Sequence, residues 1–243
     1  MITVIEATWA VRTPRGPRVL FDGVTACFGQ GERVGILAAP GSGKSSLARM
    51  LCGIQPPDRG DVVAEGRVSW PLGFSGALHP ELTGLQNIDI IARTLGEDTL
   101  EMAAFCTAFA GPEVPLERKV KYFAPTQRLA LAFSLSMSVA CDHYIADEVV
   151  GFGDGVTRAR STAMLEQRLE RAGLVYISRN PSQLKRLCSR FMVLASGRLI
   201  DCPTPEIGAE VLKLAAERDG SSDGASRAAF SERFISEPEV QDV

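Results

Sequence analysis

One short stretch constrains the fold of this chain more than any other: AAPGSGKS, from Ala38 to Ser45. It follows ERVGIL, residues 32–37, which predicts a buried strand, and residues 45–52 predict a helix with Gly53 at its C-terminal end. Glycines in such a loop let backbone N–H groups converge on phosphate oxygens without interference from a Cβ atom. The positive end of the helix faces the same anion. The stretch therefore predicts a phosphate-binding loop.

The residues of this loop have separate expected tasks. Lys44 is expected to reach the β- and γ-phosphates of a nucleoside triphosphate, and the hydroxyl of Ser45 to bind Mg²⁺. A plain Gly-rich turn is the alternative, and the flanking strand and helix favour the phosphate site. Ala38 stands where the pattern more often has its first glycine. The residues of this stretch that are predicted to bind the nucleotide are Ala38, Ala39, Pro40, Gly41, Ser42, Gly43, Lys44, Ser45 and Ser46.

A second, acidic site is predicted in DHYIADE, residues 142–148, where a short apolar strand ends in two acids. Asp147 is expected to hold Mg²⁺ through water, and Glu148 to orient or deprotonate the attacking water. A strand that ends in a solvated acidic turn is the alternative. Glu148 and Lys44 are thus the predicted catalytic residues, and Ser45 and Asp147 the predicted metal ligands.

Composition excludes several functional classes. The chain has 243 residues, 45% of them hydrophobic and 23% charged, as in an ordinary soluble globular protein. A net charge of −3 gives no reason to expect nucleic acid as a partner. The six cysteines are scattered without a CxxC pair and are interpreted as reduced thiols of a cytosolic protein. The start has no leader pattern, and the longest apolar run, residues 129–141, is too short to cross a bilayer.

Predicted strands and helices alternate along most of the chain. Residues 1–35 predict short antiparallel strands, residues 56–62 a turn, and residues 80–137 a helical block. Strands are also predicted at 66–72, 143–147 and 174–178, helices at 158–172 and 181–190, and a hairpin at 191–201. This order predicts an α/β domain with a separate helical lobe.

The domain is expected to span residues 1–214, with its helical lobe at about 80–140. Residues 215–243 are polar, rich in small residues and without apolar periodicity, which predicts a disordered C-terminal tail.

Two blocks of the chain resemble a known family. They are RVSWPLGFSGALHPELTGLQNIDIIARTLG at residues 67–96 and RLALAFSLSMSVACDHYIADEVVGFGD at residues 128–154. With RTPRGPRVLF near the start, they are similar to the ATP-binding subunits of bacterial capsular polysaccharide exporters, which are ABC transporters. The resemblance covers about residues 1–202.

This resemblance implies an ABC-type P-loop NTPase core with a mostly parallel sheet, an antiparallel β lobe and a helical lobe. It implies ATP and Mg²⁺ as ligands and a dimer that encloses two ATP molecules. The dimer is expected to drive membrane-spanning permease subunits from the cytoplasmic face of the bacterial inner membrane. The dimer partner is either a second copy of the chain or another ATP-binding subunit.

At several positions where the family pattern has nucleotide-contacting residues, this chain has a different residue. Val11 stands where an aromatic residue stacks on adenine, while Trp9 is two residues away and is expected on the opposite face of a strand. Losing the stack is expected to weaken ATP binding by about 1–3 kcal/mol. His79 stands at the glutamine that senses the γ-phosphate and magnesium, and a surface loop residue is the alternative interpretation.

The signature and the switch position are altered too. Pro125 and Thr126 stand where serine and glycine donate to the γ-phosphate across the dimer, and proline removes one backbone N–H. Proline does suit the first turn of the helix that follows. Arg179 stands at the switch histidine; arginine binds phosphate but cannot accept a hydrogen bond. Asp154 matches the aspartate of the dimer-spanning loop or is a plain turn aspartate, and His143 is expected to be a packed core residue.

Three functions therefore stay open. The first is an energising ATPase subunit of a polysaccharide exporter. The second is an ATP-binding subunit that hydrolyses slowly and acts by nucleotide occupancy, because several positioned donors are altered. The third is an unrelated soluble P-loop NTPase, such as a kinase or a DNA-repair ATPase. The absence of sustained heptads argues against the repair type.

Overall fold

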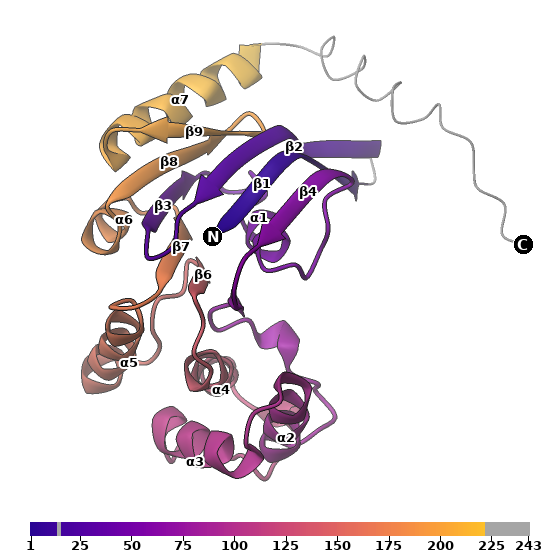
Figure 1. Cartoon of the computed structure of the whole chain (residues 1–243), viewed down its shortest axis with the longest axis vertical. Coiled ribbons are helices and arrows are strands. Elements are labelled where there is room, and N and C mark those ends of the chain that lie inside the picture. The colour runs from indigo at the N-terminus through magenta and orange to yellow at the C-terminus, as the bar shows by residue number, and fades with distance from the viewer. Residues whose placement is uncertain (14–15, 222–243) are drawn as a thin grey trace, which may run out of the picture.

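Two β-sheets organise the chain, one antiparallel and one mostly parallel (Figure 1). The computed structural model describes residues 1–13 and 16–221. The first sheet has the order β2-β1-β4 and consists of β1 (Ile2–Thr13), β2 (Gly16–Phe28) and β4 (Arg59–Ala64). The second has the order β5-β6-β7-β3-β8-β9 and consists of β5 (Val68–Pro71), β6 (His143–Asp147), β7 (Gly173–Ser178), β3 (Arg33–Ala38), β8 (Arg190–Ala195) and β9 (Arg198–Cys202).

The second sheet is parallel except for its last pair. β3 pairs in parallel with both β7 and β8, β6 pairs in parallel with β5 and β7, and only β9 runs antiparallel to β8. The central strand β7 is buried along its whole length. Continuous burial on both faces is typical of a parallel sheet covered by helices. The predicted α/β fold with a mostly parallel sheet and an antiparallel β lobe is confirmed.

Seven α-helices are described. Their bounds are α1 (Lys44–Leu51), α2 (Gly84–Leu95), α3 (Thr99–Ala110), α4 (Pro125–Ser138), α5 (Gly155–Arg168), α6 (Pro181–Leu187) and α7 (Pro205–Ser221). Two single 3₁₀ turns, Ser75–Ala77 and Val120–Tyr122, interrupt the loops before α2 and α4. Helices α2, α3 and α4 lie together at one end of the molecule, and α4 is the one nearest the mostly parallel sheet (Figure 1). They form the helical lobe that the sequence predicts.

An aromatic cluster joins this lobe to the loop that follows β6. Phe152 lies in that loop, and its ring centroid is 5.8 Å from Phe109 of α3 and 5.5 Å from Phe133 of α4. All three side chains are buried. Offset and edge-on aromatic pairs at such distances are favourable beyond the area that they bury. The end of β6 is therefore tied mechanically to the core of the helical lobe.

Three expectations about the elements are wrong. β1 and β2 are 12 and 13 residues long rather than short strands. Residues 59–62, expected in a turn, belong to β4, because β4 pairs with β1 from Ile2↔Ala64 onward. Strand pairing supplies ladder hydrogen bonds that override the local turn propensity of Gly and Asp.

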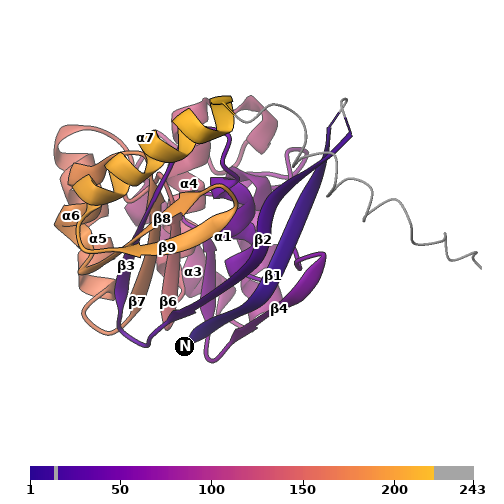
Figure 2. The ribbon, with the colours of Figure 1, turned by 90° about the horizontal axis from the view of Figure 1, so that it is seen from above.

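The third wrong expectation is that the ordered chain ends at residue 214. Helix α7 extends to Ser221, past the predicted domain boundary at residue 214. Ala215 packs with Val211 and Leu212 against a small buried cluster of the sheet formed by Val193, Ala195 and Cys202. Seen from above, α7 runs along β8 and β9 (Figure 2). The rest of the predicted tail, residues 222–243, lies outside the described residues.

Over residues 1–13 and 16–221, none of the helices combines the length and the apolar character that a membrane-spanning helix needs.

Candidate functional site

The predicted phosphate loop leads from the carboxyl end of β3 into α1. Gly41 and Gly43 have positive φ angles of 74° and 96°. At Gly43 a Cβ atom would lie 3.1 Å from Phe21 Cζ, so both the backbone and the packing require glycine there. The loop is closed by Ser42, whose Oγ donates to Ala39 O at 2.8 Å. Lys44 opens α1, and its Nζ donates to the same carbonyl at 3.2 Å.

Sheet register brings the acidic strand end to this loop. Ile177 of β7 is paired with Ile36 of β3 on one side and with Asp147 of β6 on the other. The carboxyl ends of these parallel strands therefore meet at one edge of the sheet, where open α/β folds bind their ligands. There Ser45 Oγ donates to Asp147 Oδ2 at 2.5 Å, and Lys44 Nζ lies 3.8 Å from Glu148 Oε1. The structure thus brings together the four residues of the predicted phosphate-and-metal half.

Glu148 is held in an uncommon backbone conformation. Its φ is +62°, in the left-handed region that residues other than glycine rarely adopt. Its backbone N–H donates to Ile177 O at 2.9 Å, which fixes the turn after β6 against β7. Strained residues of this kind persist where the surroundings impose them, and they cluster at functional sites.

The carboxylate of Glu148 is engaged by the end of β7. Ser178 Oγ donates to Glu148 Oε2 at 2.8 Å, and the backbone N–H of Arg179 donates to the same oxygen at 3.3 Å. Arg179 Nε donates to Glu148 Oε1 at 3.0 Å and forms an ion pair. The family resemblance implies that Arg179 meets the γ-phosphate; in this structure its guanidinium meets Glu148.

The residues present fit a magnesium-bound nucleoside triphosphate. The Ser45 hydroxyl and the Asp147 carboxylate are oxygen ligands of the kind that Mg²⁺ takes alongside substrate phosphates. The Lys44 ammonium adds a positive charge, and the backbone of the glycine loop leaves room for phosphate because Gly41 has open space where a Cβ would stand.

Two predicted contacts lie outside this group. Val11 pairs with Arg18 near the hairpin end of β1, and His79 is exposed, its backbone N–H donating to Asn87 Oδ1. In the part of the chain that the structure describes, no hydrogen bond joins His79 to the phosphate loop. The expectation that Trp9 and Val11 face opposite ways is wrong: both pack against the same core cluster, since strand residues two apart share a face.

The remaining predicted positions lie at helix starts. Pro125 is the first residue of α4, where its missing N–H is tolerated, as the sequence predicts. Thr126 follows it. The backbone N–H before Pro125, that of Ala124, is satisfied by Gln127 Oε1 at 2.9 Å. Asp154 precedes α5 without capping it through its side chain.

His143 is a buried core residue, as predicted, and stands at the start of β6. Its Nε2 is 3.1 Å from Gly29 O. Burial lowers the pKa of the His143 imidazole, and the contact with Gly29 raises it in part. The neutral ring is therefore the form that the fold accommodates.

Sequence reasoning missed two residues of the site. Arg18 of β2 reaches the phosphate loop, its Nη2 donating to Gly41 O at 3.2 Å. Ser178 holds the carboxylate of Glu148. The Gly/Pro-rich turn between Val11 and Arg18 was a usable signal for the first, because a hairpin there sets the two residues opposite each other. The position of Ser178 depends on the order of strands in the sheet, which the local sequence does not contain.

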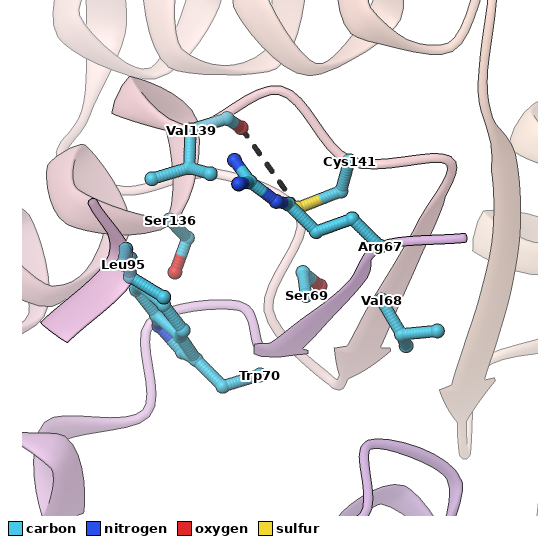
Figure 3. A pocket seen from close by; sticks show the side chains of 8 residues that line it. All are labelled: Arg67, Val68, Ser69, Trp70, Leu95, Ser136, Val139 and Cys141. Atoms are coloured by element: carbon cyan, nitrogen blue, oxygen red, sulfur yellow. Dashed lines mark hydrogen bonds between the residues drawn. The ribbon is translucent and has the colours of Figure 1, made fainter. Parts of the chain in front are cut away.

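A separate cavity lies between β5, α2 and the C-terminal end of α4 (Figure 3). It has a volume of about 50 Å³, against several hundred for a nucleotide-sized pocket. Arg67, Trp70 and Cys141 line it, and burial raises the pKa of the Cys141 thiol to about 11, which keeps the thiol protonated and unreactive. None of the phosphate-site residues lines this cavity.

The glycine loop at the carboxyl edge of a parallel sheet, with an acidic pair beside it, defines a P-loop nucleotide-binding protein. Residues 21–150 match the family profile described as ABC transporter. The chain belongs to the ABC transporter family.

Within this family, the chain is similar to ATP-binding proteins that include polysaccharide transport subunits. The chain is 32% identical over 199 residues to the capsule polysaccharide export ATP-binding protein CtrD of Neisseria meningitidis serogroup B, covering 82% of this chain and 92% of CtrD. It is 32% identical over 197 residues to the ATP-binding protein BexA of Haemophilus influenzae, covering 81% and 91%. It is 30% identical over 190 residues to the polysialic acid transport ATP-binding protein KpsT of Escherichia coli, covering 77% and 87%.

Solved structures agree with this fold. The chain superposes on the dimeric ATP-binding cassette MJ0796, in a post-hydrolysis state bound to ADP and Pi, with a TM-score of 0.64. The match covers 82% of this chain and 96% of that chain at 19% sequence identity, and it shows the fold alone.

Proposed function

We propose that this chain is the ATP-binding subunit of a bacterial ABC exporter for capsular or related surface polysaccharide. The single observation that carries the proposal is the convergence of Lys44, Ser45 and Asp147 at the carboxyl edge of the parallel sheet. The 30–32% identity to a capsule polysaccharide export subunit and a polysialic acid transport subunit, over most of the chain, supports the substrate class.

The residues of the site supply the parts that phosphoryl transfer needs. Lys44 binds the terminal phosphates of ATP, and the glycine loop supplies backbone donors. Ser45 and Asp147 hold Mg²⁺, which when bound neutralises charge on the phosphates. Glu148 orients the water that attacks the γ-phosphorus and accepts its proton, while the bond to the ADP oxygen breaks. Val11 and His79 are the proposed outer contacts of the nucleotide, while Arg179, which the family resemblance sets at the γ-phosphate, pairs with Glu148.

The chain acts, in this proposal, at the cytoplasmic face of the inner membrane, bound to membrane-spanning permease subunits. It pairs with a second copy of itself or with another ATP-binding subunit. The dimeric cassette with a similar fold supports the pairing.

A second candidate function is an ATP-binding subunit that hydrolyses slowly and works by nucleotide occupancy. The observation that favours it is the start of α4: Pro125 has no N–H to donate, where the family pattern has a signature serine. Donors aimed at a developing charge are each worth orders of magnitude in rate.

Deletion of the gene and complementation test the proposed function. The wild-type gene is expected to restore surface polysaccharide to the deleted strain, whereas a gene carrying Lys44→Ala is expected not to. Unchanged surface polysaccharide in the deleted strain would contradict the proposal.

A further inference from the structure

The carboxylate of Glu148 is held by hydrogen bonds from neighbouring residues. A carboxylate offers about four lone-pair positions on its two oxygens. Oε2 accepts from Ser178 Oγ at 2.8 Å and from the backbone N–H of Arg179 at 3.3 Å. Oε1 accepts from Arg179 Nε at 3.0 Å and lies 3.8 Å from Lys44 Nζ. Three hydrogen-bond donors and the nearby ammonium therefore compete with a water molecule for this carboxylate.

The backbone leaves Glu148 little freedom to turn away from these partners. β6 and β7 are in parallel register at Asp147↔Ile177, so Glu148, the residue after β6, lies beside the end of β7. The N–H of Glu148 donates to Ile177 O at 2.9 Å, and its φ of +62° directs the chain sharply after the strand. The pairing of the two strands therefore places Ser178 and Arg179 next to the carboxylate of Glu148.

The chemistry of Arg179 makes this contact different from one that histidine would make. A guanidinium is always charged, donates only, and matches a carboxylate through parallel donors. A neutral imidazole carries one donor and one acceptor and forms no permanent ion pair. Arginine therefore holds the carboxylate by charge and cannot pass a proton on.

We propose that Arg179 is a positioning residue that keeps Glu148 paired and so slows hydrolysis of bound ATP. This inference rests on the proposed function and adds a regulation to the same site. The Arg179 side chain is 62% exposed and that of Glu148 31%. Ion pairs this accessible to water are weak, so the pair is a reversible brake and its removal raises the rate by about fivefold rather than by orders of magnitude.

Steady-state kinetics of the purified full chain with Mg²⁺ and ATP test the brake. Arg179→Met, which removes the charge and keeps the length, is expected to raise kcat by about fivefold with an unchanged KM for ATP. Arg179→Lys, which can keep the ion pair, is expected to stay near the wild-type kcat. Arg186→Met, an exposed arginine on α6, is the matched control and is expected to change nothing. A kcat that is unchanged or lower in Arg179→Met overturns the inference, and so does a raised KM.

A second measurement uses the protein without nucleotide. Midpoints of thermal unfolding are compared for wild type, Arg179→Met, Glu148→Gln and the double variant. Coupling through the ion pair predicts that the two single shifts do not add in the double variant. Additive shifts overturn the inference.

Binding of a fluorescent ATP analogue distinguishes failure of the brake from failure of the proposed function. Saturable binding that Lys44→Ala weakens, together with an unchanged kcat in Arg179→Met, overturns the brake and leaves the proposed function standing. Absence of nucleotide binding in the wild-type chain overturns both.

Discussion

Ser45 Oγ and Asp147 Oδ2 lie 2.5 Å apart, although 102 positions separate the two residues in sequence. Ser45 lies in the first turn of α1 and Asp147 ends β6, and the parallel pairing of β6, β7 and β3 brings these two places together. Strand register thus brings together the two oxygen-bearing side chains that we propose as ligands of Mg²⁺.

The contact between Ser45 and Asp147 predicts that Asp147 contributes to Mg²⁺ affinity. Asp147→Asn removes the charged oxygen and is expected to weaken Mg²⁺ binding to the ATP-loaded chain by about tenfold or more, because interactions with a charged group contribute about 1.5–3 kcal/mol. Titration of Mg²⁺ at saturating ATP, followed by the fluorescence of an ATP analogue, measures the change. Asp89→Asn, which breaks an exposed ion pair on α2, is the control. Equal affinities in Asp147→Asn and wild type would exclude Asp147 as a metal ligand.

The glycine loop predicts two different costs at its two glycines. Gly43→Ala meets a positive φ of 96° and atoms of Phe21 and Leu20 at 3.1 and 3.2 Å, whereas Gly41→Ala meets a φ of 74° and open space. A left-handed conformation alone costs an L-residue about 1–2 kcal/mol. Urea unfolding is expected to show a loss of this size for Gly41→Ala and a larger loss for Gly43→Ala. The reverse order would contradict the packing described here.

The adenine position predicts a gain of affinity. Val11→Tyr restores an aromatic side chain at the proposed stacking position and is expected to tighten ATP binding by about 1–3 kcal/mol. Calorimetric titration with ATP measures it. Arg12→Tyr is the control, because the next residue of a strand points to the other face. A gain in the control as large as that in Val11→Tyr would show that the position of Val11 has no special relation to the base.

The buried imidazole predicts a pH dependence of stability. Burial holds the pKa of His143 below its ordinary value of 6.5, so the unfolded chain binds this proton more readily than the folded one. Stability is therefore fully present above 6.5 and is lost as the pH falls through the folded pKa, by at most about 1.4 kcal/mol per pH unit.

Unfolding midpoints of wild type and His143→Gln between pH 8 and pH 5 check this dependence. The wild-type midpoint is expected to fall more steeply on acidification than that of the variant. His79→Gln, at the other of the two histidines, is expected to follow the wild type. Parallel curves for His143→Gln and wild type would contradict the role of burial.

The strand β3, the glycine loop and the acidic end of β6 could all be predicted from the sequence, because each is a local pattern with a defined chemistry. Lys44 before a helix and Asp147 after an apolar strand need no tertiary information to be recognised. The continuous burial of β7 was equally readable from its apolar run.

Contacts that depend on strand order could not be predicted in this way. The position of Ser178 and Arg179 beside Glu148 follows from β6 and β7 being neighbours, although α5 separates them in the chain. The extension of α7 past residue 214 depends on packing of Ala215 against the sheet, which outweighs a composition that suggests disorder. Tertiary packing decides such cases more than propensity does.

The most direct test of the central claim is equilibrium binding of ATP to the purified chain in the presence of Mg²⁺, beside Lys44→Ala. The Lys44 side chain contacts the loop through Ala39 O and the acidic pair through Glu148 Oε1. Saturable binding is expected for the wild type, with an affinity at least about tenfold lower in the variant, since a charged contact contributes about 1.5–3 kcal/mol. Binding that is absent from the wild type, or equal in the two proteins, would contradict the account.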